Sequence, residues 1–364
     1  MFDPEKRAEL LRPKMMKDGK YFIAKIAGSG EEVKEDENRI AYNTYFKFKW
    51  YINNPKLLSL SPRELWSPKL LGLVENPLKA DIYHIKKLKF QNPPYSAAYR
   101  LKGKWSDIRL YSRSFLFHVG GCDYNCNFCY VPPETNACNP NFGKYFSVKE
   151  MIEYFKKARK EFDEPINVIR ITGGEATTII PEIIIETYEE MEKIEDTYLW
   201  IDTNLSTTKY MEKLESDMKS IMQKKNVGVV GCFKGVSEED FSMLTGAKQE
   251  FYEKQFETAK LFLDWKTDFY VYLPALIYEN NIEVKTKIFI KKLQELNKNL
   301  PLRVEVLIIK DYPAAVKNME LKAREGRPTP KNDQRIFFDL WYNKLLPKFY
   351  SKEMLNKFCC EVPL

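Results

Sequence analysis

Three of the seven cysteines lie within eight residues of one another, and their spacing suits iron–sulfur chemistry. Cys122, Cys126 and Cys129 form a C-x3-C-x2-C array in the stretch GGCDYNCNFCY, residues 120–130. Cysteine thiolates hold iron–sulfur clusters, so three of them on one loop can bind three corners of a [4Fe–4S] cubane and leave the fourth iron open to a small molecule. The alternative is a zinc site, which needs four closed ligands, and His118 is the one nearby candidate for the fourth.

Two polar motifs stand farther along the chain, each directly after a run of β-branched and aromatic residues. They are Gly173-Gly174-Glu175 in ITGGEAT and Asp202-Thr203-Asn204 in WIDTNLS. Glycine allows a backbone to approach a ligand more closely than a bulkier residue would. A buried carboxylate such as that of Asp202 can accept hydrogen bonds from ribose hydroxyls or help to coordinate a cation. The alternative for Asp202 is a plain helix cap at the end of a strand.

The cysteine array, with Phe128 before its last cysteine, resembles the cluster loop of the radical S-adenosylmethionine (radical SAM) superfamily. The second motif resembles the GGE motif of the same superfamily. The resemblance implies that the three cysteines bind the cluster and that the open iron chelates the amino and carboxyl groups of S-adenosylmethionine. It also implies that Gly173, Gly174 and Glu175 hold the methionine ammonium group. Phe128 is expected to pack near the adenine or to be a plain core residue.

The region after the third expected strand resembles the glycyl-radical-enzyme activating enzymes, such as the activator of pyruvate formate-lyase. Asp202-Thr203-Asn204 resembles their D-T-N-G stretch, and residues 231–262 resemble their D-L-K … L-T-G … N segment, with Lys234 at the lysine and Leu244-Thr245-Gly246 at L-T-G. By this resemblance, Asp202 and Thr203 lie beside the ribose and methionine end of the cofactor. Three residues depart from the pattern: Leu205 and Ala275 replace glycines, and Cys232 replaces an aspartate.

The resemblance also implies a reaction. In this superfamily the reduced cluster passes one electron to the sulfonium of S-adenosylmethionine, and the resulting 5′-deoxyadenosyl radical removes a hydrogen atom from the substrate. An electron donor such as ferredoxin or flavodoxin and anaerobic conditions are implied. Cys232 and Lys234 are the candidate catalytic residues. We expect Cys232 to be either a small buried hydrophobe or a hydrogen donor or covalent partner in the radical reaction.

Two classes of substrate stay open. The first is a protein or peptide, as the activating-enzyme resemblance implies, and the second is tRNA or a nucleobase precursor. The second hypothesis uses residues 41–54, AYNTYFKFKWYINN, where aromatic residues alternate with Lys47 and Lys49 in a mixture that suits base stacking and phosphate contact. The alternative for this stretch is a core segment with solvated lysines. A third hypothesis, a non-catalytic iron–sulfur or zinc protein, gives the GGE and D-T-N motifs no purpose.

Alternating short apolar runs and amphipathic stretches predict the elements that position these motifs. Expected strands are 114–119, 167–172, 198–203, 227–233, 268–276 and 302–309, and expected helices are 148–163, 181–192, 207–224, 248–264 and 283–297. Near-continuous apolar runs are typical of parallel strands buried on both faces. Six βα repeats predict an α/β fold, a partial open (β/α)6 TIM-like barrel, whose chemistry lies at the carboxyl ends of the strands.

The rest of the chain divides around this barrel. We expect a basic N-terminal extension or subdomain over 1–111, the radical SAM barrel over 112–310 and a helical extension over 311–364. Residues 1–111 hold 22 Lys and Arg against 13 Asp and Glu, whereas the remainder is close to neutral. Within 1–111 we expect strands at 21–27 and 81–90 and a helix near 62–73. We expect a cytoplasmic protein, because the cysteine count is odd and the sequence has no signal peptide. We expect no membrane contact, because no run of 18 apolar residues occurs. The protein is expected to be a monomer.

Overall fold

The computed structural model of the protein describes most of the chain on either side of one long gap. The described residues are 1–24, 114–161, 166–276, 281–307, 313–327, 334–355 and 359–364, with positions 42–43, 97, 100–101, 278, 309 and 357. The helix expected near 62–73, the strand expected over 81–90 and nearly all of the aromatic, lysine-containing stretch 41–54 lie outside these residues.

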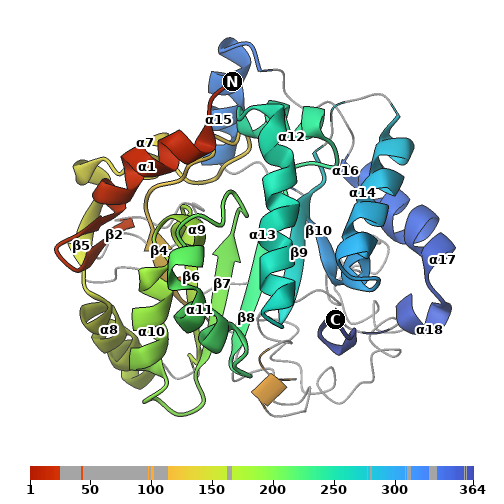
Figure 1. The fold of residues 1–364 in the computed structure, drawn as a ribbon. Helices are drawn as coiled ribbons and strands as arrows, with labels where there is room; N and C mark the ends of the chain where they lie inside the picture. Colours follow the sequence, from red (N-terminus) through yellow and green to blue (C-terminus); the bar gives the residue numbers. More distant parts are fainter. Residues whose placement is uncertain are drawn as a thin grey trace.

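Six parallel strands form the centre of the fold, and all six match strands expected from the sequence. They are β4 (Ser114–Val119), β6 (Val168–Gly173), β7 (Tyr198–Thr203), β8 (Val227–Cys232), β9 (Phe269–Pro274) and β10 (Val304–Leu307). Their order in the sheet is their order in the chain, as right-handed βα repeats predict. Among the described strands, β4 and β10 do not pair with each other. The sheet is therefore open, and the expected α/β partial barrel is confirmed (Figure 1).

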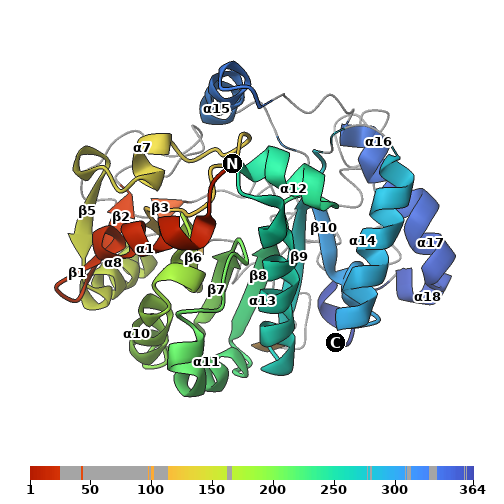
Figure 2. The same cartoon turned by 45° about the horizontal axis from the view of Figure 1, so that its top comes forward.

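A helix follows each of the first five strands and covers the outside of the sheet (Figures 1 and 2). These helices are α8 (Val148–Glu161), α10 (Glu182–Met191), α11 (Glu215–Met222), α13 (Tyr252–Asp264) and α14 (Ile282–Leu296). Ser147 begins α8 with a capping box, because its Oγ accepts from Glu150 N at 3.3 Å while the Glu150 carboxylate accepts from Ser147 N at 2.7 Å. Pro181 is the cap of α10 rather than its first helical residue.

Shorter elements join these repeats. The remaining α-helices are α1 (Pro4–Met15), α7 (Pro133–Asn136), α9 (Ala176–Ile179), α12 (Glu238–Thr245), α15 (Pro313–Arg324), α16 (Gln334–Asp339), α17 (Leu346–Phe349) and α18 (Lys352–Leu355), and the π-helix is η8 (Leu340–Leu345). Turns of 3-10 helix are η4 (Pro140–Phe142), η5 (Glu212–Leu214), η6 (Gln249–Phe251), η7 (Leu300–Arg303) and η9 (Cys359–Glu361). No helix in the described ranges has the length and apolar character needed to cross a membrane.

The first 24 residues join the barrel sheet. β2 (Lys20–Ala24) pairs antiparallel with both β4 and β5 (Gly143–Phe146), and β1 (Met16–Lys17) pairs with β2. The short β3 (Tyr42–Asn43) also pairs with β4. Ahead of β1, α1 lies against α9, and Arg12 of α1 forms an ion pair with Glu182 at the start of α10. The start of the chain is thus placed beside the ends of the first barrel strands.

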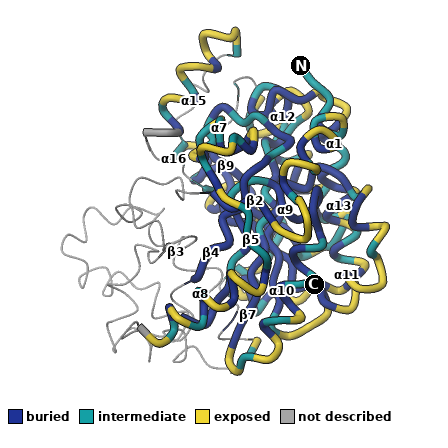
Figure 3. Tube along the Cα trace, turned by 90° about the vertical axis from the view of Figure 1, so that its left-hand side faces the viewer, coloured by how far each residue is buried: buried dark blue, intermediate teal, exposed yellow. Residues whose placement is uncertain are grey.

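Side chains on the two faces of the barrel strands differ in kind. Residues such as Ile169, Ile171 and Leu199 are fully buried and belong to the hydrophobic core, which Figure 3 shows running through the strands. Side chains alternate along a strand, so the neighbouring positions face the barrel interior. There, the rings of Trp200 and Tyr270 lie 5.4 Å apart in an aromatic middle layer.

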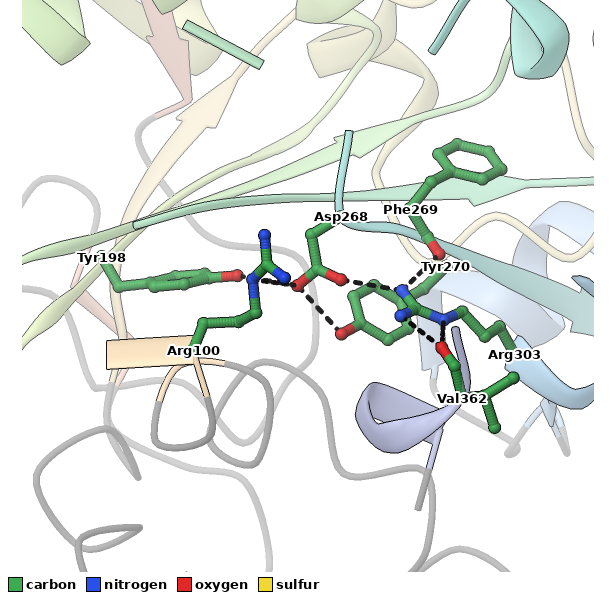
Figure 4. A network of polar contacts seen from close by, with 7 residues as sticks. All are labelled: Arg100, Tyr198, Asp268, Phe269, Tyr270, Arg303 and Val362. Atoms are coloured by element: carbon green, nitrogen blue, oxygen red, sulfur yellow. Dashed lines mark hydrogen bonds and ion pairs between the residues drawn. The ribbon is translucent and has the colours of Figure 1, made fainter. Parts of the chain in front are cut away.

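A polar network closes the barrel interior at the amino ends of the strands (Figure 4). Asp268 accepts from Arg303 Nη1 at 2.7 Å and from Tyr270 Oη at 3.0 Å. The same arginine donates from Nε and Nη2 to the carbonyl of Val362, at 2.9 and 2.6 Å. Asp268 and Arg303 are 4% and 5% exposed, so the last residues of the chain are tied to a buried ion pair. We call these four residues the floor network.

Candidate active site

The motifs singled out in the sequence meet at the carboxyl edge of the sheet. The cysteine-bearing loop, residues 120–130 and here called the cluster loop, follows β4. The GGE motif ends β6, the D-T-N motif ends β7, and Cys232 and Lys234 lie at and just after the end of β8. Because all four strands are parallel, their carboxyl ends lie side by side, as the barrel predicted.

The chemistry of the cluster loop fits thiolate ligation of a metal cluster. Cys122, Cys126 and Cys129 are free and half-buried, and burial raises the pKa of each thiol, to about 11 for Cys126. Amide groups point at two of the sulfurs: Asn204 Nδ2 lies 3.7 Å from Cys122 Sγ, and Asn136 Nδ2 lies 3.5 Å from Cys129 Sγ. N–H groups directed at cysteine sulfur stabilise the thiolate form that ligates iron.

The described residues contain no group of three His, Cys, Asp or Glu side chains that could hold a single metal ion. A cubane cluster binds each cysteine at a different iron and does not require such a group. His118, the candidate fourth zinc ligand, is 1% exposed beside Gly173, and neither ring nitrogen has a hydrogen-bond partner. Burial lowers the pKa of His118 to about 4, so the ring is neutral.

The backbone of the cluster loop is held by the turn that ends α12. Asn125 N donates to Thr245 O at 3.1 Å, and Asn127 N donates to Leu244 O at 2.9 Å. These carbonyls belong to the L-T-G stretch noted in the sequence, and Gly246 ends the helix with φ +77. In this structure the L-T-G stretch therefore supports the loop that carries the cysteines.

The glycines of the GGE motif allow the ends of β4 and β6 to touch. Gly174 N donates to Val119 O and Glu175 N donates to Gly121 O, both at 2.7 Å. A Cβ atom on Gly174 would lie 1.9 Å from the oxygen of Gly121, so no larger residue fits without movement of the backbone. Gly173 has φ +102, in the region that favours glycine. Gly174 therefore leaves space for the backbone of Gly121. The sequence predicted instead that the glycine leaves space for a ligand.

Glu175 is buried where three strand ends converge. Its Oε1 accepts from Thr178 N at 2.9 Å and from Thr203 Oγ1 at 3.0 Å, and its Oε2 accepts from Asn204 N at 2.5 Å. The side chain is 1% exposed, and burial, followed by the charge of Asp123, raises its pKa to about 7. The carboxylate thus caps α9 and joins β6 to the D-T-N motif.

Asn204 connects the D-T-N motif to the cluster loop. Besides contacting Cys122 Sγ, its Nδ2 donates to Asp123 Oδ1 at 2.7 Å. Its carbonyl accepts from Gln255 Nε2 at 3.0 Å. Gln255 lies on α13, is fully buried, and also bonds Cys232 O at 3.3 Å and Lys234 N at 3.2 Å. Sequence reasoning missed Gln255, because a single glutamine on an amphipathic helix carries no motif.

Asp202 is engaged by an arginine of the neighbouring strand. Arg170 donates from Nε and Nη2 to the carboxylate at 3.0 and 2.8 Å, and Thr172 Oγ1 donates at 2.6 Å. The two charged side chains are 12% and 15% exposed on the interior face of the barrel. The sequence predicted either a ribose or cation contact or a helix cap for this carboxylate, and neither includes an arginine. Sequence reasoning missed Arg170, because it belongs to no motif. Placement of Asp202 beside the cofactor stays a prediction.

Cys232 and Lys234 lie on either side of a buried phenylalanine, Phe233. Burial raises the pKa of the half-buried Cys232 thiol to about 12, so the thiol is protonated at neutral pH. Lys234 Nζ lies 5.9 Å from the centre of the Phe128 ring. Although burial lowers the pKa of Lys234, the nearby cysteines raise it above its ordinary value, which keeps the ammonium charged. The structure thus brings both candidate catalytic residues to the edge that carries the cluster loop.

A comparison with protein-family models finds the radical SAM superfamily over residues 116–286. The chain carries a radical SAM domain. The matched residues include the cluster loop and the GGE, D-T-N and L-T-G motifs, so the superfamily resemblance is confirmed. Members of this superfamily are enzymes that use a [4Fe–4S] cluster and S-adenosylmethionine, the cofactors expected from the sequence.

Solved structures that are similar to this chain share little sequence identity with it. SuiB of Streptococcus suis bound to its precursor peptide SuiA is 18% identical, with a TM-score of 0.35, over 49% of this chain and 36% of SuiB. The structure of anSMEcpe with bound AdoMet is 16% identical, with a TM-score of 0.38, over 63% of this chain and 57% of the other. In these alignments the chain spans less than two thirds of either relative. A search of curated proteins found no match.

Leu205 occupies a backbone conformation that favours glycine, next to the radical SAM domain's D-T-N motif. Its φ is 61, at the position where the activating enzymes carry glycine. The side chain is fully buried, and a Cβ atom on Gly231 would lie 2.7 Å from Leu205 Cδ1. Leu205 thus adopts a left-handed conformation that is usual for glycine, and Gly231 leaves room for its side chain.

Proposed function

We propose that this protein is a radical SAM enzyme that cleaves S-adenosylmethionine and abstracts hydrogen from a protein or peptide. The observation that carries the proposal is the hydrogen-bonded unit in which Asn204 contacts Cys122, Asp123, Glu175 and Gln255. One network thereby links the cysteines, the GGE motif and the strand end that bears Lys234. When bound, the cluster and S-adenosylmethionine supply a 5′-deoxyadenosyl radical, and the protein supplies position and electrostatics.

The chain's own residues divide the work of binding. Cys122, Cys126 and Cys129 hold the cluster. Glu175 has accepted three hydrogen bonds, and a carboxylate offers about four acceptor positions, so one is left for the methionine ammonium group. A cation at that position would favour the ionised carboxylate against the burial that raises its pKa. Phe128, Asp202 and Thr203 border the same edge and complete the proposed cofactor site.

Cys232 is the proposed hydrogen donor: its S–H would give a hydrogen atom to the substrate radical, and one electron from the ferredoxin or flavodoxin donor with one proton would return the resulting thiyl radical to the thiol. Cys232 faces the barrel interior beside Asp202 and Lys234, and its thiol keeps its proton at neutral pH. A protonated thiol suits hydrogen-atom donation, whereas metal ligation requires a thiolate. We expect Cys232→Ala to keep cluster content while product formation falls at least tenfold, measured by mass spectrometry of the substrate. Full product formation by Cys232→Ala would remove this role.

A protein or peptide substrate is favoured over RNA by the pairing of the charges in the barrel. Arg170 is held bidentately by Asp202, which neutralises a charge that a phosphate would otherwise use. On α1, Arg12 is likewise paired with Glu182, whereas Arg7 donates to the neutral carbonyl of Cys122. The resemblance of 198–262 to activating enzymes agrees with this choice, and ferredoxin or flavodoxin is the proposed electron donor.

Cofactor loading and nucleic-acid content test the proposal together. Anaerobically reconstituted protein should hold about four irons and four sulfides per chain. Addition of S-adenosylmethionine should then change the electron paramagnetic resonance spectrum of the reduced cluster, and Cys122→Ala should abolish both results. RNA that co-purifies with the full chain and dissociates steeply with salt would support the nucleic-acid alternative. Absence of a cluster in correctly folded protein would overturn the proposal.

A further inference from the structure

Three side chains from outside the matched domain donate hydrogen bonds to carbonyls of the cluster loop. The bonds are Arg7 Nε to Cys122 O at 3.1 Å, Arg327 Nη2 to Asn125 O at 2.7 Å and Asn318 Nδ2 to Cys129 O at 2.6 Å. Arg7 comes from α1, Asn318 from α15, and Arg327 follows α15 by three residues. Segments on both sides of the matched domain therefore hold the loop that carries the cysteines.

Arg327 is a half-buried cation without a carboxylate partner among the described residues. Its Nη1 is buried and has no hydrogen-bond partner. The nearby Glu325 is engaged with Lys322, at 3.0 and 2.9 Å. Gly246 admits the guanidinium, because a Cβ atom there would lie 2.7 Å from Nη1. A partly buried cation without a counter-charge among the described residues would be stabilised by a nearby anion.

The cysteines are the groups that can supply this negative charge. Arg327 is hydrogen-bonded to Asn125 O, next to Cys126 in the chain, and Lys234 Nζ lies 5.9 Å from the ring of Phe128, next to Cys129. Lys234 also forms no ion pair with a carboxylate in the part of the chain that the structure describes. A [4Fe–4S]2+ core with three thiolates carries a net charge of about −1, and one-electron reduction adds a further negative charge. Two cations thus converge on the loop where negative charge would increase.

We infer that Arg327 is a positioning residue for the cluster loop whose charge raises the reduction potential of the cluster. A nearby positive charge stabilises the reduced, more negative form relative to the oxidised form, most strongly where water is excluded. The hydrogen bond to Asn125 O fixes the guanidinium against the loop. The inference rests on the proposed function, because it requires the cluster, but it concerns a residue outside the matched domain.

The test is a redox titration of the reconstituted full-length protein, followed by electron paramagnetic resonance. Arg327→Gln removes the charge, Arg327→Lys retains it, and Arg324→Gln removes a charge from the exposed side of α15. We expect the midpoint potential of Arg327→Gln to be more negative than that of wild type. Arg327→Lys should lie close to wild type, and Arg324→Gln should match it because solvent screens an exposed charge.

Each outcome separates the inference from the proposed function. Wild-type protein that takes up no [4Fe–4S] cluster would contradict the proposed function itself. A loaded Arg327→Gln variant with the wild-type potential would overturn only the role of Arg327. Equal shifts in Arg327→Gln and Arg327→Lys would show geometry rather than charge to be responsible and would also overturn it. Loss of the cluster from Arg327→Gln but not from Arg327→Lys would support the positioning role, since the three cysteine ligands are untouched in both variants.

Discussion

At the scale of single residues, Asn204 holds the candidate active site together. Its backbone N–H bonds Glu175, its amide bonds Asp123 and contacts Cys122, and its carbonyl accepts from Gln255. The side-chain amide serves Asp123 and Cys122, whereas the backbone serves Glu175 and Gln255. A replacement without a side-chain N–H, such as Asn204→Ala, therefore takes the donor away from the buried Asp123 Oδ1.

Glu175 gives the folded protein a pH dependence that can be measured without cofactors. Its pKa is raised from 4.5 to about 7, chiefly by burial. Between those values the folded chain keeps a proton that the unfolded chain has lost, so this group makes stability fall as pH rises. The shift corresponds to about 3 kcal/mol. Relative to wild type, Glu175→Gln should therefore gain about 3 kcal/mol between pH 4.5 and pH 8.

Urea denaturation of the apoprotein at several pH values measures this change. Glu189→Gln is the matched control, because Glu189 lies exposed on α10. Its stability should follow that of wild type across the pH range. Parallel stability curves for Glu175→Gln and wild type would contradict the raised pKa of Glu175.

At the scale of elements, the sequence predicts the strands better than the contacts between their ends. All six barrel strands are found because parallel strands buried on both faces consist of nearly unbroken apolar runs. α12 was missed as a helix, since its eight residues are too few for a clear period, although Ser237 and Gly246 cap it. The GGE motif was found, but its contact with Gly121 depends on how two strand ends meet.

That contact predicts a large effect for Gly174→Ala. The added Cβ atom would meet Gly121 O, so the ends of β4 and β6 must separate and two hydrogen bonds must lengthen. We expect a loss of about 3 kcal/mol or more in the free energy of unfolding, from overpacking together with weakened hydrogen bonds.

Gly19→Ala is the control for the cost of the backbone conformation alone. Gly19 has φ +68, and a Cβ atom there would meet nothing within 4 Å. We expect this change to cost only about 1 kcal/mol. Urea denaturation of both variants makes the comparison, and an equal or smaller loss for Gly174→Ala would disprove the close contact.

At the scale of the whole molecule, residues far apart in sequence close the two ends of the barrel. Arg7 and Cys122 are 115 residues apart, and Asn318 and Cys129 are 189 apart. Such pairs leave no periodic signal in a single sequence, so neither α1 nor α15 could be assigned to the cluster loop beforehand. Cys359 and Cys360 are likewise far in sequence from Asp268 and Tyr270, and the structure buries them near the floor network.

The floor network predicts how the C-terminal residues contribute to stability. Arg303→Met removes the closer arginine partner of the buried Asp268, leaves the longer ion pair with Arg100 at 3.8 Å, and removes two bonds to Val362 O. Breaking a buried ion pair from one side costs about 3–5 kcal/mol, so urea denaturation should show a loss in that range. Adding Asp268→Asn should restore part of the loss, because the buried side chain that has lost its closer arginine is then neutral. A single variant within about 1 kcal/mol of wild type would contradict this role.

Formation of 5′-deoxyadenosine is the measurement that tests the central claim most directly. The full-length protein is reconstituted anaerobically, reduced with dithionite and mixed with S-adenosylmethionine, and the nucleoside is quantified by chromatography and mass spectrometry. We expect wild-type protein to form 5′-deoxyadenosine and Cys126→Ala, prepared in the same way, to form none. A wild-type protein with an intact [4Fe–4S] spectrum that leaves S-adenosylmethionine uncleaved would contradict the account.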